Sequence, residues 1–505
     1  MAGTLTGYRS LLNLVNLNII GIPNIRVTGN LSLNFGLGHT MCPFGDFIDE
    51  NLWFMYKKKL MVDTYFRQFQ NRGNCIFRSL QYRNYRLFFS GQSISLIGTW
   101  IQRIATPWLV YHLTGSAFLL GIVGFAGQIP TFILAPYAGV VTDRLNKYHI
   151  LIGTQIAAMI QAFILAILYF TGTIEVWHIL ALSIFLGFIN AFDVPARQSL
   201  VIHMVDKKED LGNAIALNSS MVNGARLLGP SIAGMLIAFT GEGVCFLVNG
   251  ISYLFVLLFL MMMKVNLPAE NKKESRVMEE LKEGFNYTFG FLPIKYIILL
   301  LALVSLMGMP YTVLMPVIAK EILHGSSHTF GFLMGASGLG ALTGALYLAS
   351  RKNVLGLGRI IPLAAVVFGA GLIAFSLSKY FWLSMLLMVV VGLGMMLQMA
   401  SSNTILQTIV DDDKRGRVMS FYTMAFMGTA PFGSLMAGGL AKSIGVQNTI
   451  LIGGVACIIG GFVFAGKLPE IRKAIHPIYV KMGFIPEEIS SGIQSATELT
   501  FSSKE

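Results

Sequence analysis

Four charged residues lie within long apolar segments of the sequence, where ionised side chains are rare. They are Arg103, Asp193, Arg197 and Arg226. Charges at membrane depth are costly, so such residues face a water-filled cavity or one another. Asp193 is the one carboxylate well inside these segments, and desolvation raises the pKa of a buried acid toward the working pH range. Asp193 could therefore carry protons; alternatively it forms a structural ion pair with Arg197, four residues along the chain, or with Arg226.

Amide side chains recur in the same apolar segments. Such residues could line a substrate pathway, although amide hydrogen bonds also hold helices together in lipid. The candidates for a substrate cavity are Gln102, Gln128, Asn190, Asn223, Gln398 and Asn403.

The sequence does not indicate an enzyme. Its four cysteines show no CxxC or metal-ligand spacing, and no nucleophile–base pair stands at membrane depth. A Gly-x-x-x-x-Gly-Lys-[Ser/Thr] stretch is also absent, which argues against an ATP-driven pump. We therefore predict no catalytic residue, no metal site and no cofactor.

The charged and polar residues are carried by a chain with the composition of a membrane protein. Of its 505 residues, 54% are hydrophobic and 12% are charged, whereas soluble domains have about 25% charged residues. Twelve apolar runs each approach the ~20 residues that a transmembrane helix needs. The predicted spans are 87–111, 117–141, 148–171, 177–203, 213–238, 243–264, 294–319, 329–350, 359–378, 381–408, 418–441 and 447–466.

Basic residues concentrate in the loops on one side of these spans. The net charge of +12 could suggest nucleic acid as a partner, but the basic residues occupy short loops instead of one face, so we exclude it. Positive loops stay inside, which places both termini in the cytoplasm. The predicted organisation is an N-terminal extension 1–86, a six-helix bundle 87–264, a cytoplasmic linker 265–293, a second bundle 294–466 and a cytoplasmic tail 467–505. The extension reflects a start site set too early or an amphipathic surface segment.

Two sequence patterns occur twice, about 205 to 210 residues apart. Val205-Asp206 and Val410-Asp411 each precede a Gly-rich apolar helix that closes on Ala-Gly, at Gly234 and Gly438. Leu-x-Gly-Ser followed by a further glycine occurs at 113–121 and again at 323–331. Internal repeats of multi-helix units are typical of secondary transporters, which move two matched bundles around a central site.

The loop between the second and third spans is similar to a known signature. It reads Gly139-Val-Val-Thr-Asp143-Arg144-Leu-Asn-Lys147. It resembles the Gly-x-x-x-Asp-Arg-x-Gly-Arg-Lys loop of the major facilitator superfamily. The resemblance implies that Gly139, Asp143, Arg144 and Lys147 form a latch that closes the cytoplasmic side and releases during transport. Asn146 replaces the second glycine, which is tolerable because Asn visits the left-handed region readily, and Tyr148 replaces a basic residue.

The fifth span carries a second pattern of that superfamily. Gly224-Ala-Arg-Leu-Leu-Gly229-Pro230-Ser-Ile-Ala-Gly234 resembles its antiporter motif, Gly-x-x-x-Gly-Pro-x-x-Gly-Gly. Pro230 kinks a helix, and the glycines permit close helix contact. The resemblance implies exchange of a substrate for protons, whereas the residues alone indicate a tightly packed, kinked helix.

Further segments are similar to the bacterial drug-exporter branch that holds enterobactin exporters and macrolide efflux proteins. They include Arg83-Asn-Tyr-Arg-Leu-Phe-Phe, Asp193-Val-Pro-Ala-Arg-Gln and Arg415-Gly-Arg-Val-Met-Ser. The resemblance covers residues 78–485 and implies the all-α major facilitator fold, with twelve transmembrane helices in two pseudo-symmetric six-helix bundles. It also implies a monomeric transporter of the bacterial inner membrane, which exports a drug, macrolide or siderophore in exchange for protons. A lipid transporter, such as one for lysophospholipids, and a non-transporting membrane receptor are the alternatives.

Overall fold

A computed structural model describes residues 77–264, 277–351 and 353–484, which all belong to one unit, Gly73–Glu505. Every regular element in these ranges is a helix. Residues 1–76, 265–276 and 485–505 lie outside the described part. The expectations for most of the N-terminal extension, for the start of the linker and for the end of the tail therefore stay predictions.

The first half contains six long helices that match the first six predicted spans. A short 3₁₀ turn, η1 (Arg78–Gln81), precedes them. The helices are α3 (Arg83–Thr114), α4 (Ala117–Arg144), α5 (Lys147–Phe170), α6 (Val176–Ile202), α7 (Lys208–Thr240) and α8 (Glu242–Met261).

The second half follows the same plan with two broken segments. Its elements are α9 (Val277–Gly290), α10 (Leu292–Leu303), η2 (Val304–Gly308), α11 (Tyr311–Val317), η3 (Ile318–Ile322), α12 (Ser327–Ser350), α13 (Leu357–Leu377), α14 (Phe381–Ile409), α15 (Asp412–Thr423), η4 (Met424–Gly428), α16 (Ala430–Ile444) and α17 (Val446–Lys481). The π-helical turns η2 and η4 each directly precede a proline-containing turn, at Pro310 and Pro431. Proline supplies no backbone N–H, so the regular bonding pattern is interrupted there.

Ten of the described helical segments are long and apolar enough to cross a membrane, and α10 to η3 count together as one of them, Leu292–Ile322. The segments α3 and α15–α16 are not among the ten. α3 is diluted by polar residues such as Gln92, Gln102 and Arg103, and α15 begins with a run of charged residues. The expected count of twelve spans therefore remains a prediction for these two segments.

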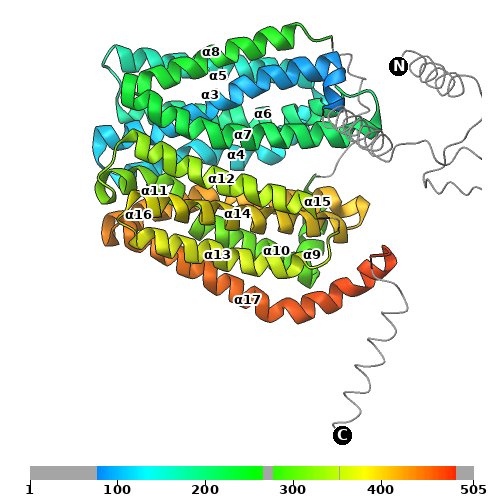
Figure 1. The fold of residues 1–505 in the computed structure, drawn as a ribbon. Coiled ribbons are helices and arrows are strands. Elements are labelled where there is room, and N and C mark those ends of the chain that lie inside the picture. Colours follow the sequence, from blue (N-terminus) through cyan, green and yellow to red (C-terminus); the bar gives the residue numbers. More distant parts are fainter. Residues whose placement is uncertain (1–76, 265–276, 352, 485–505) are drawn as a thin grey trace, which may run out of the picture. The chain divides into compact units, whose positions relative to one another are not determined.

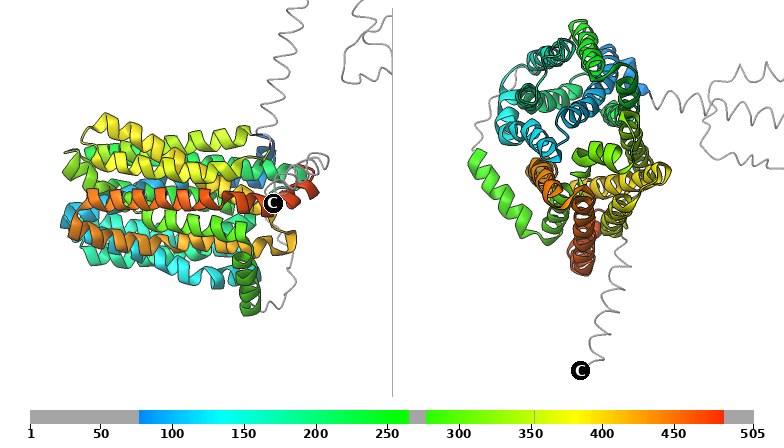
Figure 2. Two further views of the ribbon diagram at one scale, coloured as in Figure 1. Left: turned by 90° about the horizontal axis from the view of Figure 1, so that it is seen from below. Right: turned by 90° about the vertical axis from the view of Figure 1, so that its left-hand side faces the viewer.

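Corresponding helices pair in the same way within the two halves, which lie one above the other in Figure 1. In the first half α3 packs on α7 and α8, α4 on α6, and α5 on α6 and α8. In the second half α12 packs on α14, and α13 packs on α14 and α17. The halves meet along two seams, α7 against α12 and α4 against α16. Figure 2, viewed along the helices, shows these helices arranged around a common centre.

The repeated glycines of the sequence meet one another at these seams. A Cβ atom on Gly121 of α4 would lie 2.9 Å from the Cα of Gly438 of α16. A Cβ on Gly331 of α12 would lie 2.8 Å from the Cα of Gly234 of α7. Each crossing therefore brings a glycine of one repeated pattern, in one half, against a glycine of the other repeated pattern, in the other half. Small residues let the backbones approach this closely in a membrane, where packing holds helices together.

The described part of the predicted linker packs on the second half. Glu283 of α9 forms an ion pair of 2.6 Å with Arg417 of α15, and Phe285 meets the ring of Phe421 edge-on. The last helix is longer than the predicted span 447–466, because Ile471 and Ile475 are buried and continue its packing surface into the predicted tail.

We expect replacement of Gly438 by alanine to destabilise the protein by about 1–3 kcal/mol, because the added methyl group overlaps backbone atoms of α4 that cannot move aside. Thermal unfolding of the detergent-purified protein measures this effect. A methyl group added to the neighbouring Gly439 would meet no atom of another helix within 4 Å, so Gly439→Ala is a matched control that should leave the melting temperature unchanged or slightly raised. Equal effects of both substitutions would contradict the close crossing.

Candidate functional site

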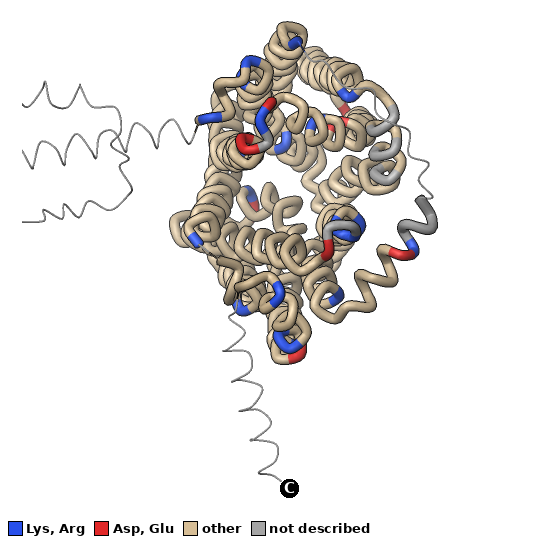
Figure 3. Tube along the Cα trace, turned by 90° about the vertical axis from the view of Figure 1, so that its right-hand side faces the viewer, with Lys and Arg blue, Asp and Glu red and all other residues tan. Residues whose placement is uncertain are grey.

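The two ends of the helices differ in charge, and we name them accordingly. The basic end carries the connections 145–146, 203–207 and 351–356, together with α9 and the start of α15. The distal end carries the connections 115–116, 171–175, 323–326 and 378–380. Figure 3, which looks onto the basic end, shows Lys and Arg at many of its helix ends.

Asp193 is buried between two helices of the first half and is fully bonded. Its carboxylate is paired with the guanidinium of Arg197, one turn further along α6. It also accepts hydrogen bonds from Oγ1 of Thr154 at 3.0 Å and from Nε2 of Gln155 at 2.6 Å, both on α5. Of the two partners that the sequence left open, Arg197 pairs with Asp193 and Arg226 does not. This geometry is that of a structural ion pair whose carboxylate is buried and whose guanidinium is partly exposed.

Arg103 and Arg226 come together at a tryptophan. The Cζ atom of Arg103 lies 5.0 Å from the centre of the Trp100 ring, and that of Arg226 lies 5.9 Å from it. Trp100 is held in place because α3 packs against Gly229 of α7, where the Trp100 Cβ occupies the space that a larger residue would need. Nη2 of Arg226 points toward the second half and donates to Sδ of Met395 on α14, at 3.6 Å.

The six candidate amides have different environments. Gln102 is buried and bridges three helices: it donates to Gln161 on α5 at 2.9 Å and accepts from Asn249 on α8 at 2.7 Å. Gln128 and Asn223 each donate to a carbonyl of their own helix. Gln128 is exposed and Asn223 is half-buried, so both retain accessible surface.

The remaining three amides include one without a partner. Asn190 is half-buried, and Asn403 accepts a hydrogen bond from Gln407 at 2.7 Å. The Nε2 atom of Gln398 is buried and has no hydrogen-bond partner among the described residues. A buried amide donor costs free energy unless it is bonded, so Gln398 is a position where a bound water or polar group would be stabilised.

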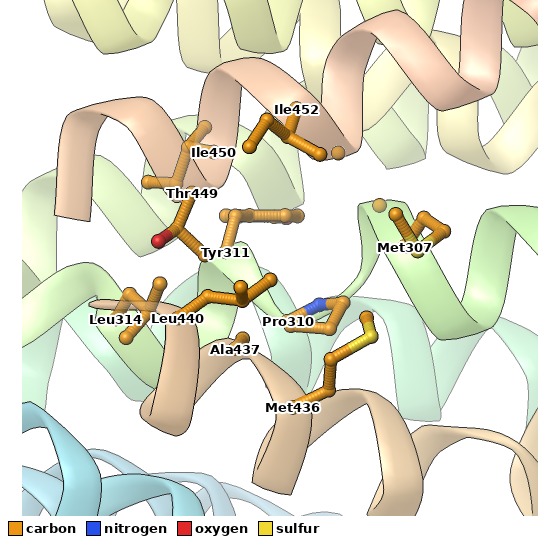
Figure 4. Close-up of a pocket in the computed structure, with 12 residues that line it drawn as sticks. Met307, Pro310, Tyr311, Leu314, Met436, Ala437, Leu440, Thr449, Ile450 and Ile452 are labelled. Atoms are coloured by element: carbon orange, nitrogen blue, oxygen red, sulfur yellow. The ribbon is translucent and has the colours of Figure 1, made fainter. Parts of the chain in front are cut away.

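Two cavities lie away from these amides. One is a crevice between α11, α16 and α17, lined by apolar side chains that include Met307, Pro310 and Met436 (Figure 4). Its volume of ≈ 10 Å³ admits no more than one water molecule. The other, of ≈ 420 Å³, opens at the distal end between the two halves and is lined by residues such as Tyr111, Glu321 and Lys442.

The halves are linked beside this distal cavity by polar contacts. The hydroxyl of Tyr111 on α3 donates to Glu321 on η3 at 2.9 Å. The hydroxyl of Ser327 on α12 donates to the carbonyl of Gly234 on α7 at 3.2 Å. Lys442 of α16 lies 5.5 Å from the ring centre of Phe118 on α4. Together with the glycine crossings, these contacts close the distal end of both seams.

At the basic end, Gly139, Asp143 and Arg144 form the last turn of α4, but their side chains lie outside the described residues. Lys147 is buried at the start of α5. Asn146 adopts an extended conformation with a φ of −65°, so this position does not use the left-handed region that Asn tolerates. Its side chain instead caps α5 by accepting from the backbone N–H groups of Tyr148 and His149. Tyr148 donates to a carbonyl of α8, which explains how this position serves packing without a basic residue.

The glycines of the fifth-span motif face different partners. Gly229 packs on α3 in its own half, whereas Gly234 packs on α12 in the other half. No atom of another helix lies within 4 Å of where a methyl group on Gly224 would stand. Pro230 is buried within α7, and the helix continues through it. The motif therefore joins the Trp100 region to the seam between the halves.

Comparison with known proteins agrees with this architecture. Residues 75–483 match the family described as transmembrane secretion effector. The chain belongs to this family of the major facilitator superfamily. It is a multi-pass membrane transporter of the cell membrane, as its apolar helices also indicate.

Several relatives of this transporter match it over nearly their full length. A staphyloferrin A transporter of Staphylococcus aureus is 27% identical over 77% of this chain and 97% of its own. Macrolide efflux protein A of Streptococcus pyogenes is 22% identical over 78% and 98%. The multidrug efflux pump Tap of Mycolicibacterium fortuitum is 22% identical over 74% and 93%.

Solved structures share the fold at low sequence identity. A POT family transporter in complex with 5-aminolevulinic acid has a TM-score of 0.63 at 12% identity, covering 77% of this chain and 96% of its own. A bacterial homologue of the iron transporter ferroportin, in an inward-facing state, has a TM-score of 0.59 at 16% identity, covering 76% and 98%.

Sequence reasoning missed two features of this transporter. Trp100 was not singled out, although its position three residues before Arg103 places both on one helix face. Glu242 is buried at the distal start of α8, where it contacts Nδ1 of His112 at 3.1 Å and accepts a hydrogen bond from Tyr169 at 2.8 Å. Glu242 lies at the end of a predicted span, where a charged residue is normally exposed. The sequence could not show that side chains of neighbouring helices bury it.

We expect Asp193→Asn to destabilise the protein by up to about 3–5 kcal/mol, because the partly buried Arg197 charge loses its counter-charge. The double variant Asp193→Asn/Arg197→Gln should recover a large part of this loss, since it removes both charges. Thermal unfolding in detergent measures both. A single variant as stable as the unaltered protein would show that the pair does not stabilise the fold.

We expect Tyr111→Phe to open the distal end more readily, because Glu321 loses its hydrogen-bond donor. A cysteine at position 116, which lines the distal cavity, should react roughly 5-fold faster or more with a membrane-impermeant thiol reagent, on a background without the four native cysteines. Tyr137→Phe is the control, because Tyr137 is exposed near the basic end of α4, away from the distal contacts. Unchanged reactivity would mean that this hydrogen bond does not hold the distal end closed.

Proposed function

We propose that this transporter exports a small amphiphilic or hydrophobic compound, such as a drug, macrolide or siderophore, in exchange for protons. The relatives named as efflux proteins support export. In this proposal the basic end, with both termini and the linker 265–293, faces the cytoplasm. The closed distal seams then correspond to a state that shuts out the exterior and receives substrate from inside.

The observation that carries the coupling part of the proposal is the environment of Asp193. Its carboxylate is buried, paired with Arg197 and bonded to two polar side chains of α5. Protonation would neutralise the carboxylate and weaken the ion pair between the two residues, which would leave Arg197 uncompensated. This loss of charge within one bundle would favour a different packing of α5 and α6. Alternating access needs a change of this kind, which stabilises one of two conformations over the other.

The latch at the basic end is a further part of the proposal. Gly139, Asp143, Arg144 and Lys147 would close the cytoplasmic side when the distal end opens. An acid next to the N-terminal end of a helix in the opposite half is favoured by the helix dipole, which supplies a reversible contact.

The transport proposal is tested in proteoliposomes with an imposed pH gradient. Internal pH is followed with a fluorescent dye while amphiphilic drugs and catecholate siderophores are added. Substrate-triggered proton movement that is absent in Asp143→Ala supports antiport. Substrate movement without proton movement would contradict coupling and leave uniport.

We expect Asp193→Asn/Arg197→Gln to bind substrate but to lose substrate-triggered proton movement, because it lacks the carboxylate that we propose as the proton carrier. The double variant is chosen because it avoids leaving the partly buried Arg197 unpaired. Binding is measured on the same preparation by tryptophan fluorescence. Proton movement equal to that of the unaltered protein would remove Asp193 from the coupling role.

A further inference from the structure

Arg103 and Arg226 stand out because neither has an acidic partner among the described residues. Arg103 is exposed although it lies in the middle of the packed helix α3, and its guanidinium contacts the Trp100 ring. Arg226 is half-buried, and its guanidinium donates to a thioether sulfur, which is a weak acceptor. Charged side chains at this depth are stabilised by a counter-charge or by water.

The contacts of Arg226 place this pair close to where the two halves meet. Arg226 lies on α7, which packs on α12 of the second half, and its guanidinium reaches Met395 on α14. The guanidinium of Arg103 lies 5.0 Å from the centre of the Trp100 ring, which Arg226 approaches to 5.9 Å. Both guanidinium groups therefore adjoin one aromatic ring near the second half.

The charges in this region do not balance. Three arginines, Arg103, Arg197 and Arg226, are accompanied by one buried carboxylate, Asp193. That carboxylate is already occupied by Arg197 and by two hydrogen bonds from α5. Two positive charges consequently remain without a carboxylate partner in the described part of the chain, and mutual repulsion adds to the cost of keeping them together.

We propose that Arg103 and Arg226, on either side of Trp100, form a subsite for the carboxylate of an amphiphilic organic anion. This proposal rests on the transport function proposed above and specifies its substrate class. A guanidinium presents paired N–H donors that match a carboxylate, and the indole offers an apolar face to the adjoining part of the substrate. The accessible surface of Arg103 allows such a group to reach it.

The test uses two fluorescent probes that differ in charge alone. Dansylglycine carries a carboxylate, and dansylglycinamide replaces it by a neutral amide. Binding to the full chain in lipid nanodiscs is followed by energy transfer from tryptophan to the dansyl group. We expect the anion to bind about tenfold more tightly or better, as for a hydrogen-bonded charge pair.

The variants Arg103→Gln and Arg226→Gln should each remove this preference and leave the binding of the amide unchanged. Arg103→Lys keeps the charge and should retain part of the preference, since it loses only the forked geometry. Arg86→Gln is the matched control: Arg86 is exposed near the basic end of the same helix, and its replacement removes the same charge. Folding is checked for each variant by its melting temperature.

Equal affinity of the unaltered protein for the two probes would overturn the proposal. A parallel loss of affinity for both probes in the glutamine variants would also overturn it, because it would indicate a structural role. The two proposals fail in different ways. Transport of neutral or cationic compounds without anion preference would leave the transport function standing, whereas charge-selective binding without transport would leave the subsite standing.

Discussion

The close approach of backbones at two crossings decides how the halves of this transporter can move. At α4–α16 and α7–α12 a glycine of one half lies against a glycine of the other, and a single added methyl group would meet backbone atoms. Without a hydrophobic force between helices in lipid, packing and hydrogen bonds hold such a seam. Contacts of this kind are lost together when helices separate, so in the proposed transport cycle the seam would switch between a closed and an open arrangement with little between them.

The charged side chains in the middle of the helices are of two kinds. Asp193 and Arg197 satisfy each other within one half, with Thr154 and Gln155 completing the carboxylate's hydrogen bonds. Arg103 and Arg226 have no such compensation among the described residues and share one aromatic ring. The hydrogen bonds from Thr154 and Gln155 to Asp193 join α5 to α6. The uncompensated cations instead favour a ligand that brings a negative charge to them.

The sequence predicted the helices well because each span is long and apolar and ends at a loop with its own signals. The sequence predicted less about which side chains contact one another. The spacing of Asp193 and Arg197 on one helix made their pairing foreseeable, since residues four apart share a face. The meeting of Arg226 with Trp100 depends on how α3 packs against Gly229, which no local pattern specifies. Gln102 shows the same limit, because whether an amide bridges helices or lines a pathway depends on which helices surround it.

The crossing of α7 with α12 and the Arg226 region belong to one mechanical element. Arg226, Pro230 and Gly234 are four residues apart in turn and therefore lie along one face of α7. That face packs on α12, where a Cβ on Gly338 would lie 2.9 Å from the Arg226 carbonyl oxygen and a Cβ on Gly331 would meet the Gly234 backbone. A rotation of α7 that opens the seam at Gly234 must also move Arg226 relative to Met395 on α14. Pro230, which lies between them, removes one backbone hydrogen bond and lowers the cost of bending there. Binding of an anion at the proposed subsite and closure of the distal end would thus be coupled through a single helix, α7, and no separate chain of contacts would be needed to link them.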